Sequence, residues 1–193
     1  MPYEYDVFFS YKRDRQSDAW HHAVMQKLQY WLRHELSKAD VPVFFDTEEI
    51  QTGARWRNHL AEALRASKTM VCVWSPLYFQ SPWCVSEWKT FEARESLCGQ
   101  ELIVPATYFD GACFPDAAKG RQMLDLSNYT STMARFWETQ AAVDFEEKCL
   151  RPLARDMAAS VRRAPPFSPD FPVVEVPGAD LSPRPPIQRI AYG

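Results

Sequence analysis

Several features that would indicate other classes of protein are missing from this sequence of 193 residues. No apolar run approaches the ~18 residues of a membrane-spanning helix, and the amino-terminal residues have neither the basic flank nor the apolar block of a signal peptide. The net charge of −3 argues against a strongly electrostatic nucleic-acid binder. No expected strand is followed by the Gly-x-Gly-x-x-Gly fingerprint of a Rossmann dehydrogenase. We therefore expect a cytoplasmic protein that binds no membrane and no nucleic acid directly.

Signs of a disulfide framework or a metal site are also missing. The five cysteines are odd in number and scattered, and no two form a Cys-x-x-Cys pair, which is typical of a reduced cytosolic protein. His21 and His22 are neighbours in an expected helix, where adjacent side chains point in different directions. We therefore expect them on the helix surface and expect no metal site.

Short apolar segments rich in aromatic and β-branched residues alternate with segments of helical periodicity. The expected strands are 5–11, 41–46, 69–74, 101–109 and 124–129, and the expected helices are 18–37, 55–66, 81–96 and 139–163. Pro105 indicates an edge position or a bulge in the fourth strand, and Pro152 should kink or split the last helix. The alternation predicts a parallel, doubly wound α/β sheet with helices on both faces. Ligands bind such sheets beyond the carboxyl ends of the strands.

The composition changes abruptly at Ala164. Eight of the fifteen prolines fall between Pro165 and Pro186. We expect residues 1–163 to form one domain and residues 164–193 an extended tail or linker, too poor in apolar residues to build a second core. The tail could lie along the domain surface or remain a polyproline-like chain, and residues 171–176 could dock as an edge strand.

The stretch 75–88 (SPLYFQSPWCVSEW) carries the strongest functional pattern. Ser81 is a natural helix N-cap and Pro82 a natural first helical residue. Trp83 and Glu87 are four residues apart, so they share one face of that helix close to the end of a buried strand. An acid beside an aromatic ring at this edge of a sheet is typical of a ligand or catalytic site. The alternative is a tryptophan that anchors the core and a solvated helix acid.

Three ordered motifs resemble those of TIR (Toll/interleukin-1 receptor) domains. Residues 5–13 (YDVFFSYKR) resemble the first conserved box of the family. Residues 43–46 (VFFD), followed by a loop that contains Gly53, resemble its second strand and BB loop. Ser75-Pro together with residues 81–88 (SPWCVSEW) resembles its third strand and the helix after it. The resemblance spans about residues 3–163 and implies a flavodoxin-like α/β fold with about five parallel strands.

The resemblance also implies an activity. Some TIR domains cleave the nicotinamide–ribose bond of NAD⁺, and these carry a glutamate one turn past a tryptophan, which correspond here to Glu87 and Trp83. Glu87 is then the catalytic carboxylate, NAD⁺ is the substrate, and no cofactor is implied. The side chains that would contact NAD⁺ are Ser10, Tyr11, Lys12, Arg13, Phe44, Asp46, Ser75 and Trp83.

Short TIR proteins of this type resemble components of bacterial antiphage defence, which deplete NAD⁺ or make a cyclic ADP-ribose-type signal for a separate effector. The family implies a TIR homo-oligomer on activation and a role for a separate sensor or effector protein. The alternative is a non-catalytic scaffold that acts only through contacts between TIR domains. Hydrolysis and cyclisation both stay open, because the product depends on whether water or the adenine reaches the ribosyl cation.

Overall fold

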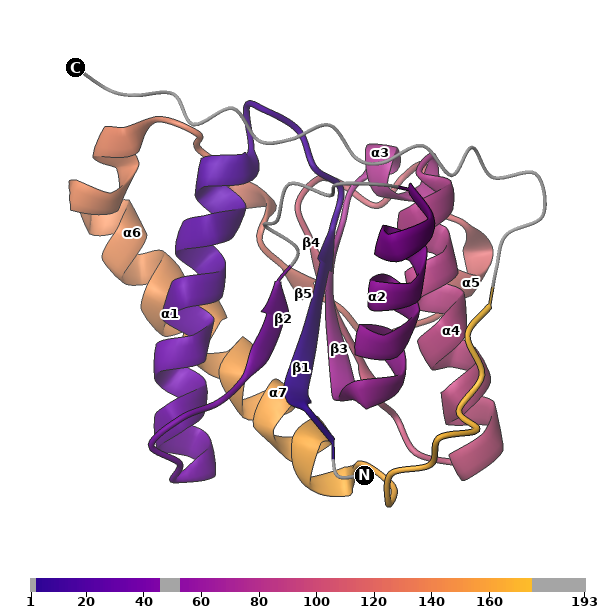
Figure 1. Cartoon of the computed structure of the whole chain (residues 1–193). Coiled ribbons are helices and arrows are strands. Elements are labelled where there is room, and N and C mark those ends of the chain that lie inside the picture. The colour runs from indigo at the N-terminus through magenta and orange to yellow at the C-terminus, as the bar shows by residue number, and fades with distance from the viewer. Residues whose placement is uncertain (1–2, 46–52, 175–193) are drawn as a thin grey trace.

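Five parallel strands form the centre of the computed structural model, which describes residues 3–45 and 53–174 (Figure 1). Their order across the sheet is β2-β1-β3-β4-β5. The strands are β1 (Tyr5–Tyr11), β2 (Val43–Phe45), β3 (Ser67–Trp74), β4 (Ile103–Thr107) and β5 (Leu124–Asp125). Every strand pair is parallel. The predicted flavodoxin-like α/β fold is confirmed.

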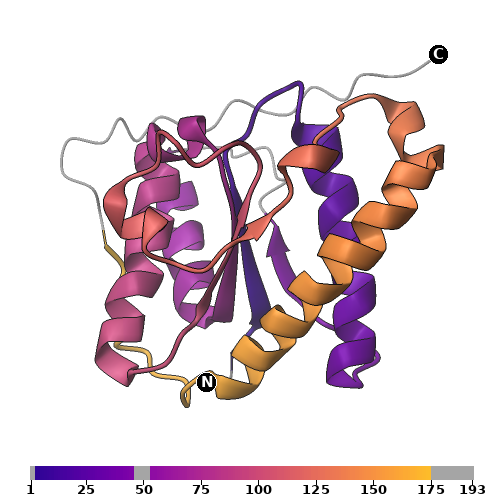
Figure 2. The same cartoon turned by 180° about the vertical axis from the view of Figure 1, so that it is seen from behind.

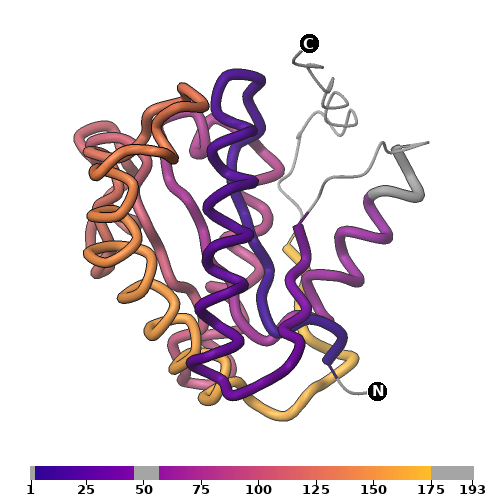
Figure 3. The backbone as a smooth tube through the Cα atoms, turned by 90° about the vertical axis from the view of Figure 1, so that its left-hand side faces the viewer, coloured from indigo at the N-terminus to yellow at the C-terminus, as the bar shows by residue number. Residues whose placement is uncertain are grey.

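Helices cover both faces of this sheet. One face packs against α1 (Asp18–Leu36) and α7 (Arg151–Arg163), and the other packs against α2 (Gly53–Ala66) and α4 (Pro82–Cys98). Helix α1 lies to the left of the strands in Figure 1 and in front of them in Figure 3, whereas α2 and α4 lie to their right in Figure 1. Successive side chains of β1 therefore alternate between two apolar cores. Tyr11 belongs to the core under α1, whereas Phe8 belongs to the core under α2 and α4. The near-continuous apolar run of β1 reflects this burial on both faces.

Short helical turns complete the connections. A single turn, α3 (Pro76–Phe79), follows β3 outside the expected helices. The chain between β4 and the last helices holds α5 (Asp116–Lys119) and the 3-10 turns η1 (Ser127–Tyr129) and η2 (Ala134–Glu138), which are seen from behind in Figure 2.

Pro152 does not split the last helical segment, because residues 140–163 are helical throughout, but the helix changes its form just before this residue. This segment consists of α6 (Gln140–Phe145), a π-helical stretch η3 (Glu146–Leu150) and α7. Pro152 lies in the first turn of α7. Proline has no N–H to donate to the carbonyl four residues earlier, and its ring clashes with that carbonyl, so the helix widens just before it.

Pro105 does not mark an edge strand, because β4 lies between β3 and the short β5. The carbonyl of Leu102 accepts a hydrogen bond from the N–H of Met70, and the N–H of Tyr108 donates one to the carbonyl of Trp74. The backbone N–H and C=O groups of the even-numbered residues in this segment therefore point toward β3. Pro105 is odd-numbered, so its backbone nitrogen points toward the β5 side, where pairing begins only at Ala106. The missing N–H of Pro105 therefore falls where the neighbouring strand has not yet started.

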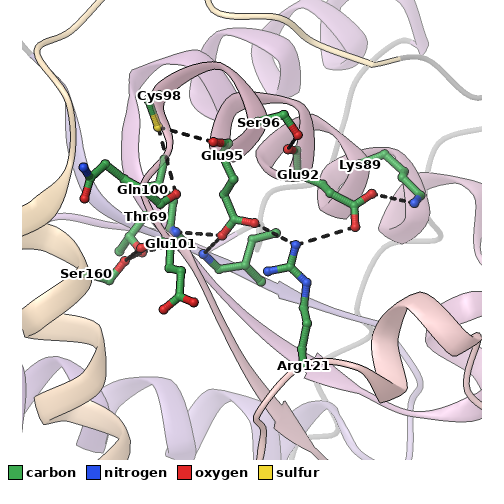
Figure 4. A network of polar contacts seen from close by, with 12 residues as sticks. Thr69, Lys89, Glu92, Glu95, Ser96, Cys98, Gln100, Glu101, Arg121 and Ser160 are labelled. Atoms are coloured by element: carbon green, nitrogen blue, oxygen red, sulfur yellow. Dashed lines mark hydrogen bonds and ion pairs between the residues drawn. The ribbon is translucent and has the colours of Figure 1, made fainter.

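A polar network fixes the carboxyl-terminal half of α4 to the sheet (Figure 4). Glu95 accepts hydrogen bonds from the backbone N–H groups of Leu102 (2.7 Å) and Ile103 (2.8 Å). Its other carboxylate oxygen lies 2.7 Å from Arg121, which also approaches Glu92 at 3.6 Å. The helix that carries Glu87 is therefore held to the start of β4 by charged groups as well as by apolar packing.

The first part of the tail lies along α2 and α4 and forms no strand within residues 164–174 (Figure 1). The carbonyl of Pro165 accepts a hydrogen bond from Tyr3 (2.9 Å), and the carbonyl of Phe171 accepts one from Arg65 (3.3 Å). The ring of Phe171 covers the guanidinium of Arg94 at 4.3 Å, and Arg94 is fully buried. Residues 175 and 176 of the strand considered above lie outside the described residues.

These contacts set the expected cost of removing the tail. We expect a chain that ends at Arg163 to fold with a melting temperature a few degrees lower, because Arg94 loses the ring of Phe171 and becomes accessible to water. A decrease of about 1 kcal/mol in the free energy of unfolding lowers the melting temperature by about 2–4 °C in a domain of this size. A chain that ends at Val174 keeps these contacts and is the control, and thermal unfolding compares the two. An insoluble or molten product ending at Arg163 would show that the domain extends beyond residue 163.

Candidate active site

Glu87 lies in the second turn of α4, under the carboxyl end of β1. Helix α4 begins where the sequence predicts, since Ser81 is its N-cap and accepts a hydrogen bond from the N–H of Cys84, and Pro82 is its first residue. Only 1% of Glu87 is exposed. The alternative of a solvated helix acid is therefore wrong, and the carboxylate is an interior group.

A chain of hydroxyl groups holds this carboxylate. Ser10 Oγ donates a hydrogen bond to Glu87 Oε2 at 2.5 Å. Since Ser10 has a single hydroxyl proton, the contact of 2.8 Å between Ser10 Oγ and the Tyr78 hydroxyl has Tyr78 as the donor. Two hydroxyls in series therefore orient the carboxyl group of Glu87.

Tyr78 is a site residue that the sequence analysis missed. It is buried in α3, and burial raises the pKa of its hydroxyl well above the ordinary value, with smaller contributions from nearby acidic groups. The hydroxyl therefore stays protonated and remains a donor. The N–H of Tyr78 in turn donates to Ser75 Oγ (3.2 Å), so Ser75 caps the turn that presents Tyr78. The available signal in the sequence was Ser75 followed by Pro76, because a serine N-cap before a proline favours the start of a helical turn, which here contains Tyr78.

The predicted NAD⁺-contacting residues fall into separate groups. Ser10 contacts Glu87 directly, and half-buried Trp83 packs at the border of the same core. Phe44 lies on this face too, where its ring stacks on Phe8 at 4.9 Å. Asp46 lies outside the described residues.

Tyr11 is not brought together with Glu87. Adjacent strand residues point to opposite faces, and the Tyr11 ring packs on the α1 side, stacked between Phe45 (5.2 Å) and His21 (4.5 Å). The structure therefore places Ser10 and Tyr11, both predicted to contact NAD⁺, on opposite faces of the sheet. Arg13 is buried, with 8% of its surface exposed.

Lys12 and Ser75 line a cavity of about 310 Å³ at the carboxyl ends of β1, β3 and β4. Its wall is formed by the loop after β1, the start of α1, the turn after β3 and the residues after β4, and it does not include Glu87. The lining residues are Lys12, Asp14, Gln16, Ser17, His21, Ser75, Pro76, Leu77, Tyr108, Phe109 and Thr132.

His21 is buried in this wall, so the expectation of a surface position is wrong. Its ring stacks on Tyr108 (5.2 Å) as well as on Tyr11, and its Nδ1 lies 2.8 Å from the carbonyl oxygen of Ser17. Burial lowers the pKa of His21 to about 3, although the hydrogen bond to Ser17 acts in the other direction. The spacing of His21 to Val24 and Leu28 on the buried face of α1 was the signal that could have located it.

Among residues 3–45 and 53–174, no three His, Cys, Asp or Glu side chains are grouped as metal ligands would be. In the same ranges, no helix is long and apolar enough to cross a membrane.

Comparison with known proteins decides the family. A model of the TIR domain matches residues 7–139, which is more than half of the chain. The chain belongs to the TIR domain family. The TIR domain of the Toll-related receptor TRR-2 from Hydra magnipapillata superposes with a TM-score of 0.50 at 18% identity, covering 79% of this chain and 98% of that one.

This TIR protein is also similar to the TIR domains of the activated Roq1 resistosome that directly recognises the pathogen effector XopQ. That match has a TM-score of 0.40 and 20% identity and covers 81% of this chain and 84% of the other. No curated protein sequence matches this TIR protein significantly. At 18% identity, the similarity to the Hydra domain bears on the fold alone.

Proposed function

We propose that this TIR protein cleaves the bond between nicotinamide and ribose in NAD⁺, with Glu87 as the catalytic carboxylate. The observation that carries the proposal is the buried Glu87 carboxylate, held by Ser10 and Tyr78 one helical turn from Trp83 at the carboxyl edge of the sheet. A scaffold has no need for an oriented acid in this position. Carboxylates buried at the ligand-binding edge of a parallel sheet are instead typical of active sites.

The chemistry suits a single carboxylate. The glycosidic bond breaks with its electron pair passing to the ring nitrogen, so nicotinamide leaves as a neutral molecule and the ribosyl carbon becomes an oxocarbenium-like cation. A fixed negative charge beside this carbon stabilises the cation, and because it is already oriented, little reorganisation is needed in the transition state. The hydroxyls of Ser10 and Tyr78 maintain that orientation. Trp83 offers the aromatic surface on which nicotinamide stacks.

Burial of Glu87 implies that the site must open before NAD⁺ reacts. A carboxylate that is 1% exposed does not reach a ribose without movement of the groups that cover it. We propose that contact between TIR domains drives this opening, with the loop after β2 of one copy docking beside the active site of the next. The proposed setting is a bacterial antiphage response, in which either NAD⁺ depletion or a cyclic ADP-ribose-type product carries the signal.

Activity should therefore depend on protein concentration. We expect nicotinamide release per molecule to be low in dilute monomer and to rise steeply with protein concentration or crowding, because only assembled copies have an open site. The measurement is the initial rate of nicotinamide release across a wide range of protein concentrations, with the mass of the particles followed by light scattering. A constant rate per molecule from a protein that stays monomeric would contradict activation by assembly.

A scaffold without catalytic activity is the second candidate, and the same experiment separates the two. A scaffold would assemble as the concentration rises and leave NAD⁺ intact at every concentration.

A further inference from the structure

The first part of the tail runs back along the helix that carries the candidate catalytic acid. We call residues 164–174 the strap; they follow the end of α7 and lie beside α4 (Figure 1). The ring of Phe171 covers the guanidinium of Arg94 at 4.3 Å, whereas Val174 donates its N–H to Thr90 Oγ1 at 2.9 Å. Since Thr90 precedes Arg94 by about one helical turn, the strap proceeds toward the amino-terminal end of α4.

The last described residue of the strap contacts α4 on both sides of Glu87. The carbonyl of Val174 accepts a hydrogen bond from Ser86 Oγ, and its N–H goes to Thr90, three residues after Glu87. Successive residues of an α-helix are about 100° apart, so Ser86, Thr90 and Arg94 form one stripe, and Glu87 lies at the border of this stripe. Thr90 and Arg94 are fully buried. The strap therefore covers the part of α4 next to the acid.

The strap also bridges α4 and α2. Arg65 of α2 donates a hydrogen bond to the carbonyl of Phe171 at 3.3 Å. Val173 packs at the border of the same apolar core as Trp83. With the strap in this position only 1% of Glu87 is exposed. Ser10 and Tyr78 hold the carboxyl group from the sheet, and the strap closes the side of α4 that faces α2.

The strap can leave the domain without breaking a helix or a strand. Four of its eleven residues are prolines, which have no N–H to donate. It forms no strand, and its backbone is bonded to the domain through side chains. These are the side chains of Tyr3, Arg65, Ser86 and Thr90. Segments with few buried contacts and few backbone hydrogen bonds open at a lower free energy than the core does.

We propose that the strap is an autoinhibitory element, which covers Glu87 from the side of α2 and exposes its carboxyl group when it is displaced. The inference rests on the proposed function, since it concerns access to the same acid. Assembly of TIR domains would displace the strap. The burial of Glu87 in the single chain and the dependence of activity on assembly then have one cause.

The test is labelling of carboxyl groups with a water-soluble carbodiimide and an amine, followed by mass spectrometry to locate the labelled residues. The variant is the full chain with Phe171→Ala and Val174→Pro together. These changes remove the ring that covers Arg94 and the N–H that Thr90 accepts. We expect the labelling rate of Glu87 to be at least tenfold higher in this double variant than in the wild type.

Two controls make the result specific. Glu95 lies about two turns further along α4 and is held by the backbone N–H groups that lead into β4, so its labelling rate should stay at the wild-type value. Asp170→Ala changes an exposed residue of the strap and should leave the labelling of Glu87 unchanged. If Glu87 in the double variant is labelled as slowly as in the wild type, the proposal is overturned. An equal rise at Glu95 would also overturn it, because the variant would then loosen the whole helix.

Activity is measured separately from exposure. In dilute protein, where the wild type should be weakly active, we expect the double variant to release nicotinamide from NAD⁺ at least tenfold faster per molecule. If Glu87 becomes labelled and neither protein cleaves NAD⁺ at any concentration, the proposed cleavage is wrong while the strap still controls access to Glu87. If the wild type cleaves NAD⁺ when concentrated and the labelled variant is no faster when dilute, the strap does not regulate the site and the inference is overturned.

Discussion

Glu87→Gln is expected to lower the rate of NAD⁺ cleavage by a factor on the order of 10² to 10³, the usual cost of removing a preorganised electrostatic group from an active site. Glutamine has the shape of glutamate, and its amide oxygen still accepts the hydrogen bond from Ser10. The fold and the melting temperature should therefore change little. What disappears is the negative charge that stabilises the developing ribosyl cation.

A matched control is available on the same helix. Glu92→Gln removes an equal charge from α4 at a position where the carboxylate pairs with Lys89 (2.5 Å) and Arg121 (3.6 Å). Ion pairs of this partly exposed kind contribute about 0–1 kcal/mol to stability, so this variant should retain the wild-type rate. Comparison of initial rates at equal protein concentration decides the matter. Equal rates for Glu87→Gln and the wild type would show that Glu87 is not the catalytic carboxylate.

Acid is expected to destabilise the protein through His21. The folded state holds this imidazole neutral, because burial lowers its pKa to about 3, whereas the unfolded chain titrates near the ordinary value of 6.5. Below pH 6.5 the unfolded state therefore binds a proton that the folded state does not. Stability is present in full above pH 6.5 and is lost as the pH falls toward 3. At ~1.4 kcal/mol per pH unit, the loss at pH 4.5 relative to pH 7 is roughly 2 to 3 kcal/mol.

Carboxyl groups also titrate at low pH, so the contribution of His21 must be taken as a difference. His21→Phe keeps an aromatic ring between Tyr11 and Tyr108 and removes the titrating group. Urea unfolding at pH 7 and pH 4.5 should show that the wild type loses roughly 2 to 3 kcal/mol more than this variant between the two values of pH. An equal loss in both proteins would mean that His21 titrates normally and is accessible to water in the folded state.

The strands were predictable because their apolar runs are short and buried on both faces. The run 5–11 coincides with β1, and the run 69–74 lies within β3. The fourth and fifth strands are shorter than their apolar patterns, because a residue is paired only where a neighbouring strand runs beside it. The missing N–H of Pro105 falls on the side where β5 has not begun, and a single sequence does not tell which side that is.

The sequence predicted the helix that carries Glu87 but not the hydroxyl groups that orient its carboxyl group. The N-cap at Ser81 and the spacing of Trp83 and Glu87 located the acid correctly on α4. The donors Ser10 and Tyr78 are 77 and 9 residues away along the chain, and only the packing of β1 and α3 against α4 brings them to it. The burial of His21 likewise depends on Tyr108, which follows the end of β4.

The proposed domain boundary at residue 163 shows the same dependence on packing. The high proline content of the tail is visible in the sequence and places the boundary there, but the contacts that the tail makes with the domain are not. The contact between Phe171 and Arg94 joins two segments that no periodicity connects. Within residues 3–45 and 53–174 no ion pair to Arg94 is present, and its buried guanidinium donates to the carbonyls of Leu64 (2.7 Å) and Ser67 (2.8 Å), which only the tertiary fold brings to it.

Chromatographic analysis of products from NAD⁺ tests the central claim most directly. The protein is incubated with NAD⁺ at the highest accessible concentration, with Glu87→Gln in parallel. We expect one nicotinamide for each NAD⁺ consumed, together with ADP-ribose or a cyclic form of it, and little or no product from the variant. Intact NAD⁺ at every protein concentration, or cleavage at the pyrophosphate instead of the nicotinamide–ribose bond, would contradict it.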